Sequence, residues 1–349
     1  MSQLPTPPLS ALRPLASLVT MAAANKSLSN ILNPFDLDPL LAAGGLAALT
    51  AGVAYAGVCL ALYRVQRSLI FRPLPTLLRT PADLGLPYED VWIPAEDGGQ
   101  LHAWWLPNHA NGERSETGSS ELDVLLFCHG NYGNISYNTE RIRFFHSLGF
   151  SVLAFDYRGY GQSVSKSTPV PTEPSTFADA ESAWHYLTQT RDIAPSRITT
   201  MGHSMGGAIA IHLAAQPIAK GMARLLVDSS FTRMEDAVRS RPIYRLFPIH
   251  QLLTEPFDSL SKVGQLTLPI LYVHGDQDFD VPMPMSKQLY AASCEPKRLW
   301  IAPGANHNNI CTEVGDRYAE VIQSFCRDYP AHSNVNNTAV PAASAPGAV

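Results

Sequence analysis

From Val124 onward, short apolar runs alternate with longer segments of mixed polarity, and this alternation limits the possible folds more than any other feature. The apolar runs are expected strands at Val124–Cys128, Val152–Phe155, Ile198–Met201, Leu225–Val227, Ile270–Val273 and Leu299–Ile301. Helices are expected between them at Thr139–Leu148, Phe177–Gln189, Met205–Ala215, Met285–Ala291 and Glu313–Cys326. Continuous apolar strands that alternate with helices are typical of an α/β fold, in which helices cover both faces of a mostly parallel sheet.

Two features modify this pattern. The segments 90–95 and 101–106 read as an antiparallel pair of strands, because a turn at Asp97-Gly98-Gly99 separates them. Residues 232–264 interrupt the alternation and are rich in Pro, Phe and Leu. We expect this stretch to form a short helical cap inserted over the edge of the sheet.

The stretch from Leu40 to Tyr63 contains no charged residue. As a helix it is long enough to cross about 30 Å of hydrocarbon, so we expect a transmembrane helix at residues 40–63. Acidic residues precede it and arginines follow it: Asp36 and Asp38, then Arg64, Arg67, Arg72 and Arg79. The positive-inside rule then places the C-terminal bulk in the cytoplasm. We expect a single-pass protein of a membrane such as the ER or the plasma membrane. A buried core helix or a cleaved targeting signal is the alternative.

The remaining boundaries follow from composition. Residues 1–39 are rich in Ser, Pro and Ala and have little pattern for a core, so they are expected to form a disordered leader. A transit peptide is the other interpretation of this leader. Residues 64–330 carry the α/β pattern, and residues 331–349 form an expected disordered tail of Asn, Ala, Pro and Ser.

Charge and cysteine content argue against several classes of function. The net charge is −5, so nucleic acid is not an expected partner, because phosphate binding needs an excess of clustered Lys and Arg. The five cysteines are scattered, odd in number and without a CxxC pair. Neither a zinc site nor a disulfide framework is therefore expected, and no metal or other cofactor is predicted.

The motif with the most chemical content is Gly202-His203-Ser204-Met205-Gly206, which follows an expected strand and opens an expected helix. This strand–turn–helix context is the one that a nucleophile elbow requires. The turn is so tight that the neighbours of the serine must be small, which accounts for Gly202 and Gly206. Ser204 is the candidate nucleophile.

Serine is a weak nucleophile and needs an adjacent base that a carboxylate orients. On this type of sheet the acid and then the histidine follow later strands. Asp278 in the run after Ile270–Val273 is the candidate acid, with Asp276 and Asp280 as competitors. His307, on the loop after the last expected strand, is the candidate base.

A tetrahedral intermediate also needs donors for its oxyanion. One expected donor is the backbone N–H of Met205, directly after the nucleophile. The other is expected from the loop that follows Val124–Cys128, at the N–H of Asn131 or, failing that, of Tyr132. An ordinary Gly-rich turn is the alternative interpretation of this loop.

The ordered segments HGNYGN, DYRGYGQS, GHSMGG, HGDQDFDVP and GANHNN, after an apolar helix, resemble the membrane-anchored α/β-hydrolases of the bud-emergence and ABHD type. The resemblance covers residues 64 to 329. It implies an eight-stranded sheet, a short cap, no metal, no organic cofactor, and Ser204, Asp278 and His307 as the triad. Many such relatives have an acidic residue shortly after the histidine, where this chain has Asn308-Asn309.

The resemblance also suggests ester or thioester substrates, either lipids or acylated proteins. The sequence thus predicts a membrane-anchored serine hydrolase that works through an acyl-serine intermediate. A serine peptidase or amidase is an alternative, because the same triad cleaves amides and the fold does not separate the two. A catalytically silent protein on a hydrolase fold is the other alternative, which the complete set of motifs argues against.

Overall fold

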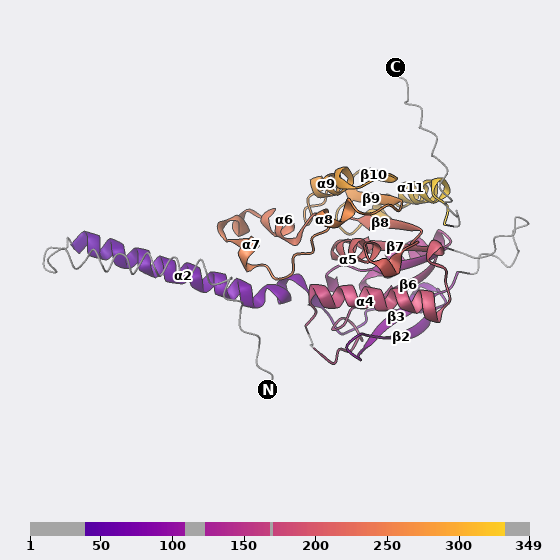
Figure 1. Cartoon of the computed structure of the whole chain (residues 1–349), viewed down its shortest axis with the longest axis horizontal. Helices are drawn as coiled ribbons and strands as arrows, with labels where there is room; N and C mark the ends of the chain where they lie inside the picture. The colour runs from indigo at the N-terminus through magenta and orange to yellow at the C-terminus, as the bar shows by residue number, and fades with distance from the viewer. Residues whose placement is uncertain (1–38, 109–122, 168–169, 332–349) are drawn as a thin grey trace, which may run out of the picture. The chain divides into compact units, whose positions relative to one another are not determined.

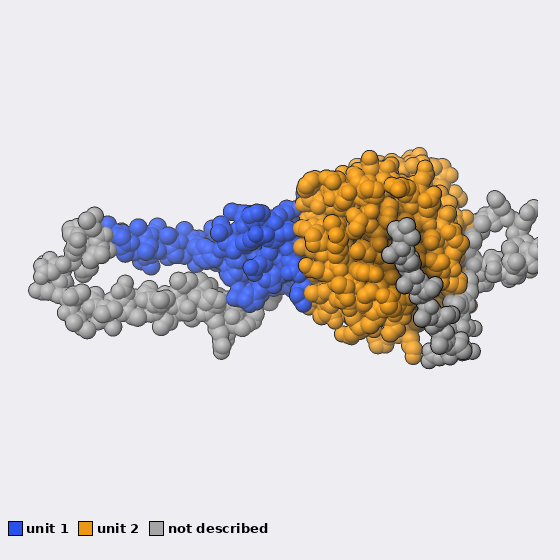
Figure 2. Space-filling view, turned by 90° about the horizontal axis from the view of Figure 1, so that it is seen from above, with its two compact units in different colours: residues 1–72, 233–256 blue, residues 73–232, 257–349 orange. Residues whose placement is uncertain are grey.

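The computed structural model describes residues 39–108, 123–167 and 170–331. The expected leader, residues 1–39, and the expected tail, residues 331–349, lie outside the described residues except for Pro39 and Ala331. Contacts divide the chain into two compact units (Figure 2). The anchor–cap unit comprises residues 1–72 and 233–256, and the sheet unit comprises residues 73–232 and 257–349. Each unit is described by itself.

Figure 1 labels most of the helices and strands. The strands are β1 (Arg72–Pro73), β2 (Glu89–Pro94), β3 (Gln100–Leu106), β4 (Val124–Cys128), β5 (Tyr132–Gly133), β6 (Ser151–Phe155), β7 (Ile198–His203), β8 (Arg224–Asp228), β9 (Ile270–Gly275) and β10 (Lys297–Ala302). The α-helices are α2 (Pro39–Ile70), α3 (Thr139–Ser147), α4 (Glu173–His185), α5 (Met205–Ala214), α6 (Met234–Arg239), α7 (Ile249–Leu252), α8 (Leu260–Val263), α9 (Pro284–Ala292), α10 (Ile310–Glu313) and α11 (Gly315–Asp328).

The sheet unit is built on one eight-stranded sheet with the strand order β10-β9-β8-β7-β4-β6-β3-β2. All neighbours from β10 to β6 run parallel, and β3 pairs antiparallel with both β6 and β2. The hairpin predicted around Asp97 is therefore confirmed, as is a mostly parallel eight-stranded sheet. In such sheets the carboxyl ends of the parallel strands meet at one edge, where binding sites form.

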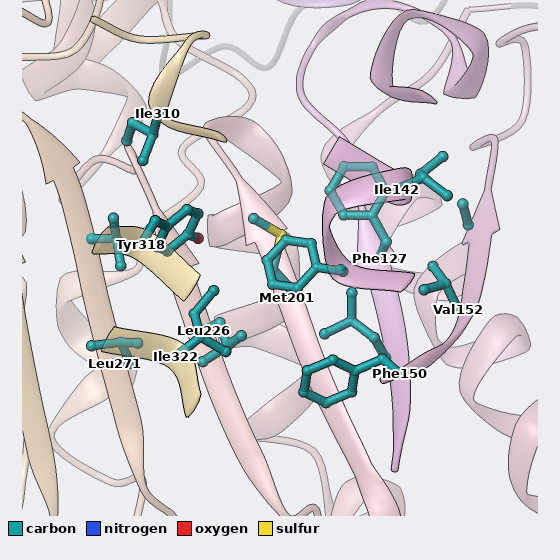
Figure 3. Close-up of a cluster of buried hydrophobic side chains, with 14 of the residues drawn as sticks. Phe127, Ile142, Phe150, Val152, Met201, Leu226, Leu271, Ile310, Tyr318 and Ile322 are labelled. Atoms are coloured by element: carbon teal, nitrogen blue, oxygen red, sulfur yellow. The ribbon is translucent and has the colours of Figure 1, made fainter. Parts of the chain in front are cut away.

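The core of the sheet unit lies on both faces of the sheet. On one face, side chains of the central strands pack against α3 and α11 (Figure 3). The buried residues of this cluster include Phe127, Ile142, Met201, Leu226, Leu271, Tyr318 and Ile322. Successive side chains of a strand point to opposite faces. Residues such as Leu126 and Leu225 therefore face the other side, where α4 and α5 pack against each other and against the central strands.

Two helices of the sheet unit differ by more than one residue from their sequence-based predictions. The helix expected from Phe177 begins at Glu173, because Thr172 accepts a hydrogen bond from the Ser175 N–H and Pro174 occupies the first turn. The helix expected at Glu313–Cys326 is two helices, because the backbone leaves helical geometry at Val314 (φ −131°, ψ 34°).

In the anchor–cap unit, α2 extends seven residues beyond the expected end at Tyr63. Arg64, Gln66 and Arg67 continue the helix, and all three residue types have high helix propensity. Its part Ala43–Ile70 is long and apolar enough to cross a membrane. The inserted segment of this unit, residues 233–256, is shorter than the expected 232–264 and contains α6 and α7. Residues 257–264 belong instead to the sheet unit, where the Ser259 N–H donates to the Thr232 carbonyl at 3.0 Å.

Candidate active site

Ser204 occupies a strained turn between β7 and α5. Its φ of 56° and ψ of −120° lie outside the regions that a residue with a side chain usually adopts. The Ser204 N–H donates to the Asp228 carbonyl at 2.8 Å, and the Ser204 carbonyl accepts from the Gly207 N–H at 2.9 Å and the Ser230 hydroxyl at 2.9 Å. These contacts hold the strained backbone in place, as the nucleophile elbow predicted from the sequence requires.

The two glycines that flank this turn are required because there is no room for a side chain at either position. A Cβ on Gly202 would lie 2.1 Å from the Gly206 carbonyl oxygen, and a Cβ on Gly206 would lie 2.0 Å from that of Cys128. Both obstacles are backbone atoms, which cannot turn aside as a flexible side chain does. The close approach also brings the N-terminus of α5 against the end of β4, which leads into the loop that carries Asn131.

The structure brings Asp278 and His307 together from loops that follow β9 and β10. His307 Nδ1 lies 2.7 Å from Asp278 Oδ2, and the His307 side chain is 11% exposed. A carboxylate can only accept a hydrogen bond, so Nδ1 carries the proton and Nε2 is left free to act as a base. The other carboxylate oxygen, Oδ1, accepts from the backbone N–H groups of Asp280 and Val281 at 2.9 Å each.

The Asp278 carboxyl is ionised by this environment. Burial would raise its pKa, but hydrogen bonds from His274 and His307 outweigh burial and hold the pKa well below its usual range. Its competitor Asp276 is exposed, and its Oδ1 accepts from the Gly304 N–H at 2.8 Å instead. Asp280 contributes its backbone N–H to Asp278. Of the three candidate acids, Asp278 is the one hydrogen-bonded to His307.

Sequence reasoning missed His274, a buried residue near the end of β9. Its Nε2 lies 2.9 Å from the Val281 carbonyl and 3.1 Å from Asp278 Oδ2, so one N–H is shared between two acceptors. Its Nδ1 accepts from the Ser286 hydroxyl at 2.7 Å, which fixes the ring. Asp278 is thus held between two histidines. The residue stands four positions before Asp278, which was the available signal.

His203, the residue directly before Ser204, contacts His307. The rings of His203 and His307 are 4.9 Å apart, and His203 Nε2 lies 2.8 Å from the His307 carbonyl oxygen. Burial lowers the pKa of His203 far below its usual value, with smaller contributions from Arg141 and His307, so this histidine is neutral and donates from Nε2. Within the described ranges, no hydrogen bond joins the Ser204 hydroxyl to His307. Such bonds are often long without substrate.

The expected oxyanion loop passes beside the nucleophile. A Cβ on Gly130 would lie 3.6 Å from Ser204 Cβ, so the loop backbone contacts the elbow closely. Two buried tyrosines of the DYRGYGQS segment fix this loop by hydrogen bonds. The Tyr157 hydroxyl donates to the His129 carbonyl and the Tyr160 hydroxyl to the Asn131 carbonyl, both at 2.9 Å. With the Asn131 carbonyl fixed in this way, the orientation of the adjacent peptide groups is restricted.

No group of three or more His, Cys, Asp or Glu side chains among the described residues is placed to hold a metal ion. This edge of the sheet presents a strained serine, a histidine with a free ring nitrogen and an ionised aspartate.

Comparison with known proteins agrees with this architecture. Residues 123–245 match the model of the alpha/beta hydrolase fold family. An uncharacterized protein of Mycobacterium tuberculosis is 33% identical over 77% of this chain and 90% of its own length. Protein bem46 of Schizosaccharomyces pombe is 29% identical over 76% of this chain and 86% of its own length. An esterase of Pyrococcus furiosus superposes with a TM-score of 0.59 at 21% identity, covering 74% of this chain and 98% of that structure. With its elbow, its sheet order and these relatives, the chain belongs to the α/β-hydrolase family that includes bem46.

Proposed function

We propose that this chain is a membrane-anchored serine hydrolase that cleaves carboxylic esters or thioesters through an acyl-serine intermediate. The observation that carries the proposal is the 2.7 Å hydrogen bond between His307 and the ionised Asp278, at the same sheet edge as the strained Ser204. Esterase activity in the structurally similar Pyrococcus furiosus protein supports the choice of reaction class.

In the proposed reaction, Ser204 Oγ attacks the acyl carbonyl carbon while His307 Nε2 takes the hydroxyl proton. Asp278 stabilises the imidazolium that forms, and the N–H groups of Met205 and Asn131 bind the oxyanion. Collapse of the tetrahedral intermediate breaks the bond to the alcohol or thiol, and His307 returns the proton to that leaving group. Water then attacks the acyl-serine with the same assistance, which releases the acid and restores Ser204.

A fluorophosphonate probe tests the nucleophile. The full chain should be labelled, Ser204→Ala should abolish the labelling, and Ser182→Ala should leave it intact. Ser182 is a suitable control because its hydroxyl only bonds to the Ala178 carbonyl on α4. Turnover of acyl esters and thioesters, measured beside peptide amides, then separates an esterase from a peptidase. Absence of labelling in the folded full chain would favour a catalytically silent protein.

We propose further that α2 anchors the chain in a membrane with the sheet unit in the cytoplasm. The apolar length of Ala43–Ile70 and the arginines after Tyr63 support this topology. Resistance of the full chain to alkaline extraction tests the anchor. Protease digestion of a C-terminal tag on sealed vesicles tests on which side of the membrane the sheet unit lies. A tag that is protected inside the lumen would show that the topology is the opposite one.

A further inference from the structure

The inserted segment of the anchor–cap unit packs along the C-terminal part of α2. The Tyr55 hydroxyl donates to the Leu246 carbonyl at 2.9 Å, and the Tyr55 ring stacks on Phe247 with centroids 5.7 Å apart. Twelve residues later, Arg67 pairs at 2.7 Å with Glu255, whose side chain is 1% exposed. The segment therefore follows the helix over about 18 Å, with its Leu246 end nearest the uncharged part of α2.

A buried glutamine strengthens this packing. Gln66 donates to the Leu252 carbonyl at 2.9 Å and accepts from the Thr254 N–H at 2.8 Å. These bonds satisfy a backbone carbonyl at the end of α7 and a backbone N–H just after it. The register between helix and segment is thus set at both ends, by Tyr55 and by the pair Gln66 and Arg67.

This register determines the depth of the segment when α2 spans a membrane, so the inference rests on the proposed anchor. The uncharged stretch 40–63 is about 36 Å long as a helix, against about 30 Å of hydrocarbon. Tyr55 lies nine residues before Arg64, or about 14 Å along the axis. The stretch is thus about 6 Å longer than the hydrocarbon. Even if all of this extra length extended out of the hydrocarbon on the Arg64 side, Tyr55 and the Leu246 carbonyl that it binds would still lie below the headgroups.

The surface of the segment fits that depth. Ile243 and Leu246, both in the 3-10 turn Pro242–Leu246, are 60% and 66% exposed. A polar solvent disfavours such exposure, whereas hydrocarbon favours it. The Leu246 carbonyl would be unsatisfied in hydrocarbon without the Tyr55 hydroxyl, and the bond between them removes that penalty.

The turn itself carries basic residues. From residue 237 to residue 254 the sequence contains Arg239, Arg241 and Arg245 and no acidic residue, and all three arginines are exposed. Arg239 also pairs at 3.2 Å with Glu235, which lies just before this range. Arginine side chains are long enough to keep their apolar part in hydrocarbon and their guanidinium groups among the headgroups. Basic residues at this level favour anionic lipids by about 1 kcal/mol each.

We propose that residues 239–247 form a second membrane contact, in which Ile243 and Leu246 insert into an anionic phospholipid bilayer and the three arginines bind its headgroups. The inserted segment is then a membrane-embedded part of the protein beside its anchor helix, and not a cap surrounded by water.

Depth-dependent fluorescence quenching tests the insertion. The full chain is reconstituted into vesicles of phosphatidylcholine and phosphatidylserine that contain brominated lipid, with a new tryptophan as Leu246→Trp or, as the control, Val53→Trp. Val53 is 65% exposed on α2 and reports the anchor alone. The five native tryptophans lie in the sheet unit and give a background that the unsubstituted chain measures.

We expect quenching at both positions. Quenching of Val53→Trp without quenching of Leu246→Trp would overturn the second contact and leave the anchor intact, whereas quenching at neither position would overturn the anchor itself. Adding Arg239→Gln, Arg241→Gln and Arg245→Gln to Leu246→Trp should lower its quenching in vesicles that contain phosphatidylserine and leave its quenching in phosphatidylcholine alone unchanged. If the tryptophan of this arginine variant is quenched as strongly as before, the proposal that the arginines bind the headgroups is wrong.

Discussion

At the scale of single residues, the turn at Ser204 tolerates almost no change. Gly206→Ala should destabilise the fold by about 1–3 kcal/mol, because the new Cβ would meet the backbone oxygens of Cys128 and His129 at 2.0 and 2.5 Å. Probe labelling of Ser204 should be lost with it. Gly315→Ala is the matched control, since among the described residues no atom beyond its chain neighbours and its own helix backbone lies within 4 Å of its Cβ position. Thermal unfolding and labelling measure both effects, and equal behaviour of the two variants would contradict this account of the turn.

Asp278 carries a second prediction at this scale, on pH. Its pKa is lower in the folded chain than in the unfolded chain, so ionised Asp278 stabilises the fold. That stabilisation is complete above the unfolded value of about 3.9 and is lost as the pH falls from there towards the folded pKa. Asp278→Asn should therefore lower the Tm at neutral pH, and its difference from the unsubstituted chain should shrink below about pH 4.

The same variant should lower kcat/KM on the order of 10⁴-fold, because an amide no longer fixes the His307 tautomer or stabilises its charged form. Hydrolysis of an acyl ester measures this loss. Asp276→Asn is the comparison, since that carboxylate bonds to Gly304 and not to His307. Comparable losses in the two variants would mean that Asp278 is not the orienting acid.

At the scale of elements, the loop after β4 depends on the loop after β6. Tyr160→Phe removes the hydrogen bond to the Asn131 carbonyl, which is worth about 1 kcal/mol. If the Asn131 N–H binds the oxyanion, kcat should fall about fivefold with little change in KM, since the interaction forms only in the transition state. Steady-state kinetics on a soluble ester measures the two parameters.

Tyr186→Phe provides the control for this prediction. The Tyr186 hydroxyl accepts a hydrogen bond from Arg191 at 2.7 Å, and the residue directly follows the end of α4. A similar fall in kcat for both variants would indicate a general loss of stability and not a displaced oxyanion donor.

Most elements of the sheet unit were predictable from the sequence because each produces a local pattern. The six apolar runs from Val124 to Ile301 all form strands, since continuous burial leaves a continuous apolar signal. The predicted start of α4 at Phe177 was too late, because Thr172 and Pro174, which begin the helix, lie before the apolar pattern. The order of the candidate residues along the sequence placed Asp278 and His307 on loops that follow strands. His274 and Tyr160 were missed because each contacts a residue in a different part of the chain. A local sequence pattern does not reveal which segments are neighbours in space.

At the scale of the whole molecule, the two units should respond differently to loss of the anchor helix. A chain that begins at Pro73 keeps Ser204, Asp278 and His307 in the sheet unit, so we expect probe labelling to persist. Segment 233–256 would lose its contacts with Tyr55, Gln66 and Arg67, and trypsin should cleave after Arg239 and Arg245 faster than in the full chain. Mass spectrometry of timed digests measures the rates.

Cleavage within the sheet unit, for example after the exposed Arg143, provides an internal standard for that experiment. Equal rates at Arg239 in the long and short chains would contradict the packing of the segment on α2. Sequence patterning could not have predicted this packing. The apolar stretch 40–63 is explained by lipid alone, and nothing in it indicates a protein partner.

The attachment of Leu246 to Tyr55 has a mechanical consequence. A transmembrane helix that is longer than the hydrocarbon tilts, and the angle changes with the thickness of the bilayer. Because residues 246–255 are held on α2 by Tyr55 at one end and by Arg67 at the other, they would rotate with it as one lever. The thickness of the bilayer differs between the ER and the plasma membrane, so the angle of this segment would differ between the two membranes.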